Sequence, residues 1–440
     1  MYKEQLITSD FGSLKKVIVQ PMLGEDRNTL PFLHETNLPG FTLDIMGTDS
    51  LREHESFRHI LGEQGVQVLE APTLINEAIS NARENNKLSS FVGGYFPKLL
   101  SFMENGGDIN AADLLGASRR SVFSNEQSSN LFRVRPLQWM IFSRDVAVAL
   151  PKGILLTNFS QPQRKLENQI TRFMFENSPQ LQEYPIVFDA ERKNVYIEGG
   201  DLMVFNNKTL LMGVDNVSSR VAAAKIAEET KMEVIAVNMP KGPLSDVGGR
   251  QFTGINSLFL HLDTIFNLVD HRKALIIPYL FNDDFAQDSP FIRILMSTLD
   301  ELKERPEAEE VRIALDSIAD IGKVTVYEPG TGREYKTEVR LENYLKQHYS
   351  YNFAYIGGEP SNTFGTQVQH FAQSVVRELR FQGGNVVALE PGKVVMYHAD
   401  TGETRKSLQG LGVDVITFDG HELMRWNGGA HCLTCPLDRE

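Results

Sequence analysis

Residues 428–440 hold the most reactive side chain of the sequence. The run Gly428-Gly429-Ala430-His431-Cys432 places a cysteine directly after glycines, and the 440-residue chain has only one other cysteine, Cys435. Because glycine has no Cβ, it lets the backbone approach a ligand closely, and a thiolate is a strong nucleophile. A lone cysteine, with histidine and acidic residues elsewhere in the chain, predicts a catalytic nucleophile.

Three further clusters carry groups that could assist a thiolate. They are Phe142-Ser143-Arg144-Asp145, Glu198-Gly199-Gly200-Asp201 and His261-Leu262-Asp263-Thr264-Ile265-Phe266. Each has an ordinary interpretation as well: an ion pair, a turn, and a structural histidine on a strand, where residues two apart face the same side.

Taken together, the clusters predict one site. Carboxylates at Asp145, Glu198 and Asp263 would form an anionic pocket, and the planar guanidinium group, with five N–H donors, is matched by carboxylate pairs. A cysteine beside a bound cation and an imidazole has its thiolate form favoured.

Cys432-Leu433-Thr434-Cys435 is also a C-x-x-C sequence, which is found in redox centres and in half zinc sites. The chain has no second cysteine pair, and the motif does not follow a strand at the head of a helix. Both interpretations are therefore disfavoured, and the mechanism implied by the resemblance described below needs no metal and no organic cofactor.

Strand and helix patterns alternate along the chain, which predicts an α/β fold. Strands are expected at 14–21, 66–69, 139–142, 146–150, 154–156, 195–197, 202–205, 209–212, 234–237, 274–277, 324–326, 386–389, 394–397 and 413–418. Helices are expected at 50–65, 221–229, 291–303, 307–318, 341–349 and 368–379. Residues 73–121 show helical stretches and no strand pattern, so a helical insertion is predicted there.

The composition excludes several classes of protein. Apolar residues make up 41% and charged residues 23%, and the formal net charge is −13. This charge opposes unaided binding to nucleic acid or to an anionic membrane, and it suits a cationic substrate. No run of about 18 apolar residues exists, and the N-terminus lacks the pattern of a secretory signal. With two cysteines three residues apart, a reducing cytoplasm is the expected compartment.

The four motifs, in this order, resemble those of the arginine deiminases, within the guanidino-modifying superfamily that includes the amidinotransferases. The resemblance extends to Gly12–Val17, Glu53–Phe57, Gly65–Leu69 and the segment from Gly384 to Val395, and so covers most of the chain. It implies a five-fold pseudo-symmetric α/β propeller, the pentein fold, as one catalytic domain over residues 1–440. Within it, 75–130 would be a helical insertion and 280–360 an enlarged insertion or lid.

The resemblance also implies a mechanism. Asp145, Glu198 and Asp263 would hold the guanidinium group of L-arginine, and Cys432 would attack its carbon. His261 would protonate the departing ammonia and then accept a proton from water. Hydrolysis of the covalent thiouronium would release L-citrulline.

Substrate-binding residues are expected at Arg164, Arg220, Asp201, Trp139 and Asn427. Arg164 and Arg220 resemble family arginines that bind the substrate carboxylate. The family has an asparagine where this chain has Trp139, and a carboxylate-binding arginine where it has Asn427. Losing one bidentate charged contact would cost roughly 1.5–3 kcal/mol of binding.

Alternatives remain open at this point. The same chemistry could transfer the amidino group to an amine, or hydrolyse another guanidino compound, and a third possibility is a non-catalytic guanidino-ligand binder on the same fold. His431 is expected to pack or to orient its neighbour, Cys432. A homo-oligomer is expected because relatives commonly self-associate.

Overall fold

The computed structural model describes residues 5–21, 48–116, 134, 137–239, 259–286, 297, 300–301, 320–361 and 363–440. The strands are β1 (Leu14–Val19), β2 (Gln67–Glu70), β3 (Ala147–Leu150), β4 (Gly153–Leu156), β5 (Ile186–Asp189), β6 (Leu202–Asn206), β7 (Thr209–Val214), β8 (Glu233–Asn238), β9 (Phe266–Asp270), β10 (Lys273–Ile276), β11 (Lys323–Tyr327), β12 (Glu334–Arg340), β13 (Asn352–Tyr355), β14 (Val387–Glu390), β15 (Lys393–Tyr397), β16 (Asp414–Phe418) and β17 (Cys435–Arg439).

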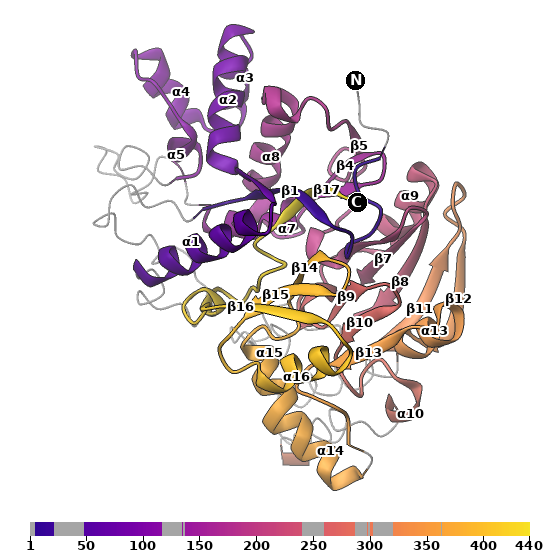
Figure 1. The fold of residues 1–440 in the computed structure, drawn as a ribbon. Helices are drawn as coiled ribbons and strands as arrows, with labels where there is room; N and C mark the ends of the chain where they lie inside the picture. The colour runs from indigo at the N-terminus through magenta and orange to yellow at the C-terminus, as the bar shows by residue number, and fades with distance from the viewer. Residues whose placement is uncertain are drawn as a thin grey trace.

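Helices connect and cover these strands (Figure 1). The α-helices are α1 (Thr48–Glu63), α2 (Ala71–Glu84), α3 (Leu88–Tyr95), α4 (Pro97–Glu104), α5 (Ala111–Leu114), α7 (Ser143–Val146), α8 (Lys165–Asn177), α9 (Arg220–Thr230), α10 (Asp283–Ala286), α13 (Leu341–Tyr349), α14 (Phe364–His370), α15 (Val376–Arg380) and α16 (Gly402–Gly410). Short 3₁₀ helices are η3 (Gln138–Ile141), η4 (Pro162–Arg164), η5 (Pro179–Leu181), η6 (Gly199–Asp201), η8 (Leu262–Thr264) and η10 (Leu423–Trp426), and a π-helical turn, η9 (Phe371–Val375), joins α14 to α15.

The described strands form five sheets, and all five contain the same arrangement. Two strands pair antiparallel, and a third strand pairs parallel to the second, after a crossover; in four of the sheets the antiparallel pair is a hairpin. The five sets are β3-β4-β5, β6-β7-β8, β9-β10-β13, β14-β15-β16 and β17-β1-β2. We call them units one to five in that order. Parallel pairing needs a crossover connection, and α8, α9, α16 and α1 lie in the crossovers of units one, two, four and five.

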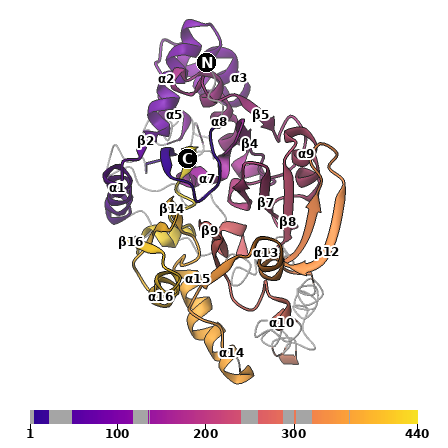
Figure 2. The ribbon, with the colours of Figure 1, turned by 45° about the vertical axis from the view of Figure 1, so that its right-hand side comes forward.

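Unit five joins the two ends of the chain. Its first strand, β17, comes from the C-terminus, and β1 and β2 come from the N-terminus. Ile7 forms a further bridge with Arg439, so the two terminal segments lie side by side, as Figure 2 shows. Unit two is larger than the others because β11 pairs with β8, and β12 pairs with β11.

The local sequence explains why α2 and α9 form helices where they do. α2 begins with a proline in its first turn, where the missing N–H is not needed. It buries Leu74, Ile75, Ala78 and Ile79, which recur at the spacing of one helix face. In α9, the Oγ atom of Ser219 accepts from the backbone N–H of Ala222 and so caps the helix.

The predicted helical character of residues 73–121 agrees with the described part of that segment. α2 to α5 lie between β2 and unit one and form the indigo group of helices in Figure 1, and residues 71–116 contain no strand. Residues 117–133 lie outside the described residues. Among the described helices, none combines the length and the apolar character that a membrane span requires.

Most predicted strands are confirmed, but two are wrong. Residues 139–142 were expected to be a strand and form the 3₁₀ helix η3 instead. Residues 195–197 form only an isolated bridge, between Ile197 and Asn158. Both runs are short and apolar, and in such runs periodicity does not distinguish a strand from another buried segment. The predicted helix 307–318 and most of 291–303 lie outside the described residues.

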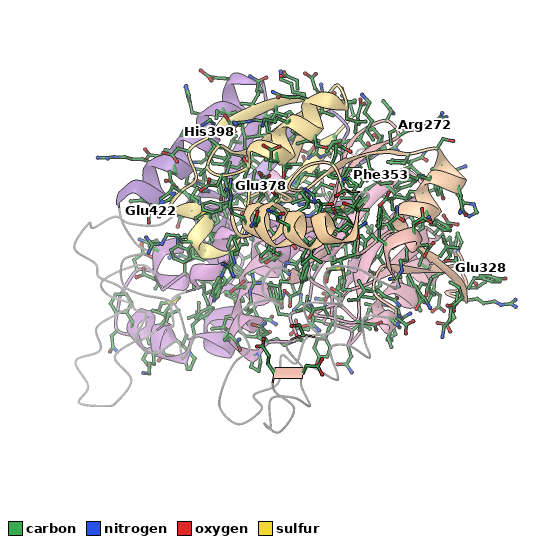
Figure 3. The ribbon with its side chains drawn as sticks, turned by 90° about the horizontal axis from the view of Figure 1, so that it is seen from below. Arg272, Glu328, Phe353, Glu378, His398 and Glu422 are labelled. Carbon is green, nitrogen blue, oxygen red and sulfur yellow. The ribbon has the colours of Figure 1, made fainter. Side chains whose placement is uncertain are left out.

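A buried carboxylate connects the helices α15 and α16. Glu378, labelled on the underside in Figure 3, is 1% exposed, and its carboxylate accepts from the backbone N–H groups of Glu403 and Thr404. These N–H groups lie in the first turn of α16, where helix donors have no partner within the helix. Glu378 therefore fixes α16 against α15.

Candidate active site

The predicted site residues occupy one structural position that recurs in the units. Asp145 precedes β3, Glu198 precedes β6, His261 and Asp263 precede β9, and Cys432 precedes β17. We call the segments 142–145, 198–201, 261–264, 384–385 and 429–432 the pre-strand turns of units one, two, three, four and five. Because each unit places this turn at the start of its antiparallel pair, residues far apart in sequence can converge.

Hydrogen bonds connect the five pre-strand turns in a closed ring. Unit one donates to unit two, from Nε of Arg144 to the carbonyl oxygen of Gly199 at 3.1 Å. Unit three donates to unit two, from Leu262 N to Asp201 Oδ1 at 2.9 Å. Asn385 of unit four joins units three and five, by donating to the Asp263 carbonyl at 3.0 Å and accepting from Cys432 N at 3.0 Å. The N–H of Arg144 then donates to the Cys432 carbonyl at 3.1 Å.

The close approach of these turns explains two of their glycines. A Cβ atom added to Gly200 would lie 2.7 Å from Cγ of His261. A Cβ atom added to Gly429 would lie 2.6 Å from Cβ of Asn385. Distances below 3.0 Å are not tolerated without movement, so both positions require a residue without a side chain.

Asp145, Glu198 and His261 form a buried cluster. Nε2 of His261 lies 3.0 Å from Oε2 of Glu198, and Nδ1 lies 3.8 Å from Oδ1 of Asp145. All three residues are at most 3% exposed. Burial alone would lower the pKa of His261, but Asp145, Glu198 and Asp201 raise it to about 10. The imidazole is therefore protonated at neutral pH, and both of its nitrogens carry a proton.

Cys432 lies beside Asp263. The thiol is directed at Oδ2 of Asp263 at 3.5 Å, and the same oxygen lies 2.8 Å from Nδ1 of His431. Burial raises the pKa of the Cys432 thiol well above its usual range, and the charges of Asp263 and Asp145 raise it further. Without a bound cation, the thiol is the favoured form.

His261 and Asp263 do not lie on a strand, so the prediction that they share one strand face is wrong. His261 is extended and immediately precedes η8, which contains Asp263. The 3₁₀ turn directs the two side chains to different partners: His261 contacts Glu198, and Asp263 contacts His431 and Cys432. The run that follows, 266–270, is the actual strand, β9.

The guanidinium group of Arg164 forms ion pairs with three carboxylates of the protein. Its Nη1 atom lies 2.9 Å from Oδ2 of Asp145 and 3.6 Å from Oε2 of Glu198. Its Nε and Nη2 atoms donate to Oε2 of Glu167 at 3.0 and 2.8 Å. The guanidinium carbon lies 3.8 Å from the centroid of the Phe159 ring. The structure thus places Arg164 at the site, where it pairs with the predicted guanidinium-binding carboxylates.

Two other predicted substrate-binding residues, Trp139 and Asp201, have different surroundings. Trp139 stacks on Phe142, with ring centroids 6.0 Å apart, and meets Trp426 edge-on at 6.5 Å. Asp201 is buried, and its contact with Leu262 N fixes the turn that carries His261. Burial raises the pKa of Asp201 to about 7, although nearby His261 opposes the rise.

Asn427 and Arg220 are more exposed than the buried site residues described above. Asn427 is exposed, and its φ of 64° is a left-handed conformation that asparagine tolerates better than most residues. Arg220 donates to Asp215 and, at 2.6 Å, to Oδ1 of Asn238. The binding of a substrate carboxylate by Arg164 and Arg220 stays a prediction.

Five carboxylate oxygens of this region have no hydrogen-bond partner among the described residues. Three belong to the predicted guanidinium-binding residues, namely Oδ1 of Asp145, Oε1 of Glu198 and Oδ1 of Asp263, and the other two are Oε1 of Glu167 and Oδ2 of Asp201. An unpaired buried acceptor costs about 1–3 kcal/mol, and more for a charged group. A planar cation with several N–H donors is the type of ligand that pairs with carboxylate oxygens such as these.

A metal ion is a second candidate occupant of the cluster. Asp145, Glu198 and His261 offer ligand atoms that all lie within 4.8 Å of one another. However, the permanently charged Arg164 already contacts two of these residues, and the pKa of about 10 keeps the imidazole protonated. A metal ion would have to displace this proton, which lowers its affinity, so the donor set fits an organic cation better.

Sequence reasoning missed three buried residues of this region. Asn385 contacts Cys432, Glu167 pairs with Arg164, and Asp10 pairs with Arg144 at 3.3 Å. Asp10 and Glu167 lie outside the recognised motifs, so no local pattern marked them. Asn385 lies in the Gly384-Asn385-Val386 segment, and its position just before an expected strand was the one available signal.

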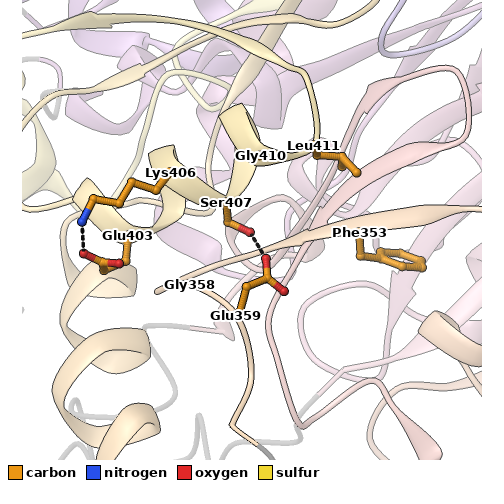
Figure 4. A pocket seen from close by; sticks show the side chains of 8 residues that line it. All are labelled: Phe353, Gly358, Glu359, Glu403, Lys406, Ser407, Gly410 and Leu411. Atoms are coloured by element: carbon orange, nitrogen blue, oxygen red, sulfur yellow. Dashed lines mark hydrogen bonds and ion pairs between the residues drawn. The ribbon is translucent and has the colours of Figure 1, made fainter.

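The site is distinct from a surface pocket of about 350 Å³ between β13 and α16 (Figure 4). There, Oγ of Ser407 donates to Oε1 of Glu359 at 2.7 Å, and Lys406 pairs with Glu403 at 2.7 Å. None of the predicted site residues lines this pocket. The candidate chemistry therefore belongs to the buried turns and not to this opening.

Comparison with known proteins adds independent information. A family model described as arginine deiminase matches residues 98–439. The arginine deiminase of Metamycoplasma hominis is 24% identical over 456 residues, covering 99% of this chain and 96% of that protein. The arginine deiminase of Streptococcus equi subsp. zooepidemicus is 26% identical over 462 residues, covering 99% and 98%.

Solved structures were compared as well. Unliganded AgrE matches with a TM-score of 0.49 at 14% identity, covering 96% of this chain, which spans 40% of the length of AgrE. The N-terminal domain of ArgZ, an arginine dihydrolase, matches with a TM-score of 0.49 at 12% identity, covering 97% of this chain and 98% of that domain.

Proposed function

Because this chain belongs to the arginine deiminase family, we propose that it hydrolyses L-arginine to L-citrulline and ammonia through a covalent intermediate on Cys432. The family model spans most of the chain, and the curated relatives named arginine deiminase are covered nearly end to end. These findings support an enzyme that acts on the guanidino group of arginine.

One observation of the structure supports this chemistry most directly. Three unpaired, buried carboxylate oxygens lie on Asp145, Glu198 and Asp263, and Asp263 contacts the thiol of Cys432. A guanidinium group that donates to these oxygens would bring its carbon next to the sulfur. Its positive charge would also offset the carboxylate charges that disfavour the thiolate.

The first half of the reaction forms the covalent intermediate. Once the guanidinium group is bound, the Cys432 thiol loses its proton to solvent, and the thiolate attacks the guanidinium carbon. A C–S bond forms, and the bond from that carbon to a terminal nitrogen breaks. His261, which holds its proton strongly between Asp145 and Glu198, transfers it to the departing nitrogen, and ammonia leaves.

The second half releases the product. Neutral His261 accepts a proton from a water molecule that attacks the same carbon. The C–S bond breaks, the sulfur returns to its initial state, and the ureido group of citrulline remains. In this scheme Glu198 and Asp145 hold both the substrate and the imidazole, so their two carboxylates serve binding and proton transfer together.

A second function is considered because three residues depart from the family pattern or from the contacts expected of them. Trp139 and Asn427 replace an asparagine and an arginine of the family pattern, and Arg164 donates to protein carboxylates. The same covalent chemistry could act on another guanidino compound, or could pass the amidino group to an amine.

One experiment separates these functions. Purified protein is incubated with L-arginine, without any amine, and ammonia and citrulline are assayed together with Cys432→Ala. Equal amounts of both products, abolished in the variant, support the deiminase. If folded wild-type protein forms neither ammonia nor citrulline, but forms ornithine and a new guanidino compound when an amine is added, the transferase is supported instead.

The five units also support a proposal about the architecture. We propose that they are arranged with five-fold pseudo-symmetry about the ring of pre-strand turns, as an α/β propeller in one domain. The helices of 75–130 would then be an insertion. In 280–360, β11 and β12 extend the sheet of unit two and would form part of an enlarged insertion. A cytoplasmic homo-oligomer is part of the same proposal, to be tested by light scattering.

A further inference from the structure

Asn385 is the contribution of unit four to the ring of pre-strand turns. In each of the other units, the same turn supplies a proposed catalytic group: Asp145, Glu198, His261 or Cys432. Asn385 directly precedes the strand region of unit four and is 1% exposed. Its position therefore matches that of residues with a chemical role.

The amide of Asn385 contacts the nucleophile with both of its ends. Its Nδ2 atom lies 3.1 Å from Sγ of Cys432 and 3.0 Å from the carbonyl oxygen of Asp263. Its Oδ1 atom accepts from Cys432 N at 3.0 Å. Both N–H groups and the oxygen of the amide therefore have a hydrogen-bond partner.

The orientation of this amide is determined by its neighbours. The backbone nitrogen of Cys432 can only donate, and the carbonyl of Asp263 can only accept. The amide oxygen must therefore face Cys432 N, and the amide nitrogen must face Asp263 O. With one N–H directed at that carbonyl, the second N–H is directed at the sulfur.

The neighbours of the sulfur act on its charge in opposite directions: two carboxylates disfavour the thiolate, whereas hydrogen bonds from the backbone of Gly429 and from the side chain of Asn385 favour it. The carboxylate of Asp263, at 3.5 Å, and the charge of Asp145 both disfavour the thiolate. Tyr397 is also close enough to interact electrostatically, but its hydroxyl group donates to the Gly428 carbonyl. Among the described side chains, Asn385 is the one whose N–H is directed at Sγ.

We propose that Asn385 is a positioning residue that stabilises the Cys432 thiolate through its Nδ2–H group while its Oδ1 atom fixes the backbone of the nucleophile. The inference rests on the proposed function, in which the thiolate attacks. A hydrogen bond to a charged group typically changes an equilibrium about ten- to a hundredfold. The thiol pKa should depend on this amide by about one to two pH units.

Asn385→Asp is the most informative change. It keeps the shape of the side chain and the acceptor for Cys432 N, but it puts an oxygen where the donor faces the sulfur. We expect the thiol pKa to rise and kcat/KM for L-arginine to fall about ten- to a hundredfold. Asn385→Ala removes the donor without adding charge, so it provides the same test if the first variant does not fold.

Asn267 provides a matched control. It is also a buried asparagine, 2% exposed, and its Nδ2 atom donates to the same Asp263 carbonyl at 2.7 Å and to the Gly384 carbonyl at 2.6 Å. Its amide is bonded to these carbonyls and not to the sulfur. Asn267→Asp should reduce thermal stability but leave the thiol pKa as it is in the wild type.

The thiol pKa is measured by ultraviolet absorbance of the thiolate against pH, in a Cys435→Ser background, with Cys432→Ser as the blank. An unchanged thiol pKa in both Asn385 variants would overturn the inference, and so would an equal shift in Asn267→Asp. This titration does not require turnover. If the wild type fails to hydrolyse L-arginine, the proposed function fails, and the titration still decides the role of Asn385.

Discussion

Nη1 of Arg164 lies 2.9 Å from Oδ2 of Asp145, so a guanidinium group of the protein itself contacts a carboxylate that we propose to hold the guanidinium group of the substrate. Only one oxygen of Asp145 is used in this way, and Oδ1 remains without a hydrogen-bond donor. Arg164 therefore orients the carboxylate and leaves its second oxygen available for a ligand.

Replacing Arg164 should reduce both stability and activity. Arg164→Gln would leave Asp145 and Glu167 as buried carboxylates without their cation, and removing one partner of a buried ion pair costs about 3–5 kcal/mol. Urea denaturation measures this loss. Arg192→Gln is the control, since the Arg192 side chain is 65% exposed and pairs at the surface, and it should change stability by less than about 1 kcal/mol.

The protonation of His261 predicts a pH dependence of stability. Its pKa in the folded protein is about 10, above its ordinary value of 6.5. The folded state thus binds this proton more tightly than the unfolded state. The resulting stabilisation is fully present below about pH 6.5, decreases above it and is lost as the pH rises through about 10.

His261→Gln removes this contribution. The difference in unfolding free energy between the wild type and the variant should shrink steadily from pH 6.5 towards pH 10, as measured by urea denaturation. A difference that is independent of pH in this window would show that the imidazole is not held in its charged form by the surrounding carboxylates.

Gly200→Ala should impair catalysis with a smaller effect on folding. The new Cβ atom would lie 2.7 Å from Cγ of His261, so the imidazole must move away from its carboxylates. A misplacement of about 1 Å can cost a hundredfold in rate. Gly94→Ala is the control: it lies in α3 with open space around it, and alanine there favours the helix by up to about 1 kcal/mol. Steady-state kinetics of both variants would decide between misplacement and general destabilisation.

Asn427→Arg should strengthen binding of L-arginine. It restores the family arginine at an exposed position, and one bidentate charged contact contributes roughly 1.5–3 kcal/mol. The left-handed backbone of Asn427 would cost arginine about 1 kcal/mol, so a KM lower by about two- to thirtyfold is expected.

The same variant should not change KM for a guanidino compound that lacks a carboxylate. Comparing the two substrates therefore separates carboxylate binding from a general change at the site. An equal change in KM for both compounds would exclude a carboxylate clamp at residue 427.

Sequence patterns predicted the secondary structure best where each unit repeats its strands. β4, β8 and β15 were recognised as apolar runs, and α13 was predicted at 341–349 as observed. The predictions failed at and just before the pre-strand turns, where 139–142 and the His261 segment contain 3₁₀ helices. Residues 139–142 are a short apolar run, and in such a run periodicity does not distinguish a strand from another buried segment.

The sequence by itself determined which chemical groups this protein could use. A single glycine-flanked cysteine, a histidine and three carboxylates in local motifs were sufficient to predict an anionic site with a nucleophile, because reactivity depends on residue type. Only the tertiary structure decided how those groups are paired. Asp10 meets Arg144, and Asn385 meets Cys432, across 134 and 47 residues of chain. Such contacts depend on how the five units converge, and no local pattern encodes them.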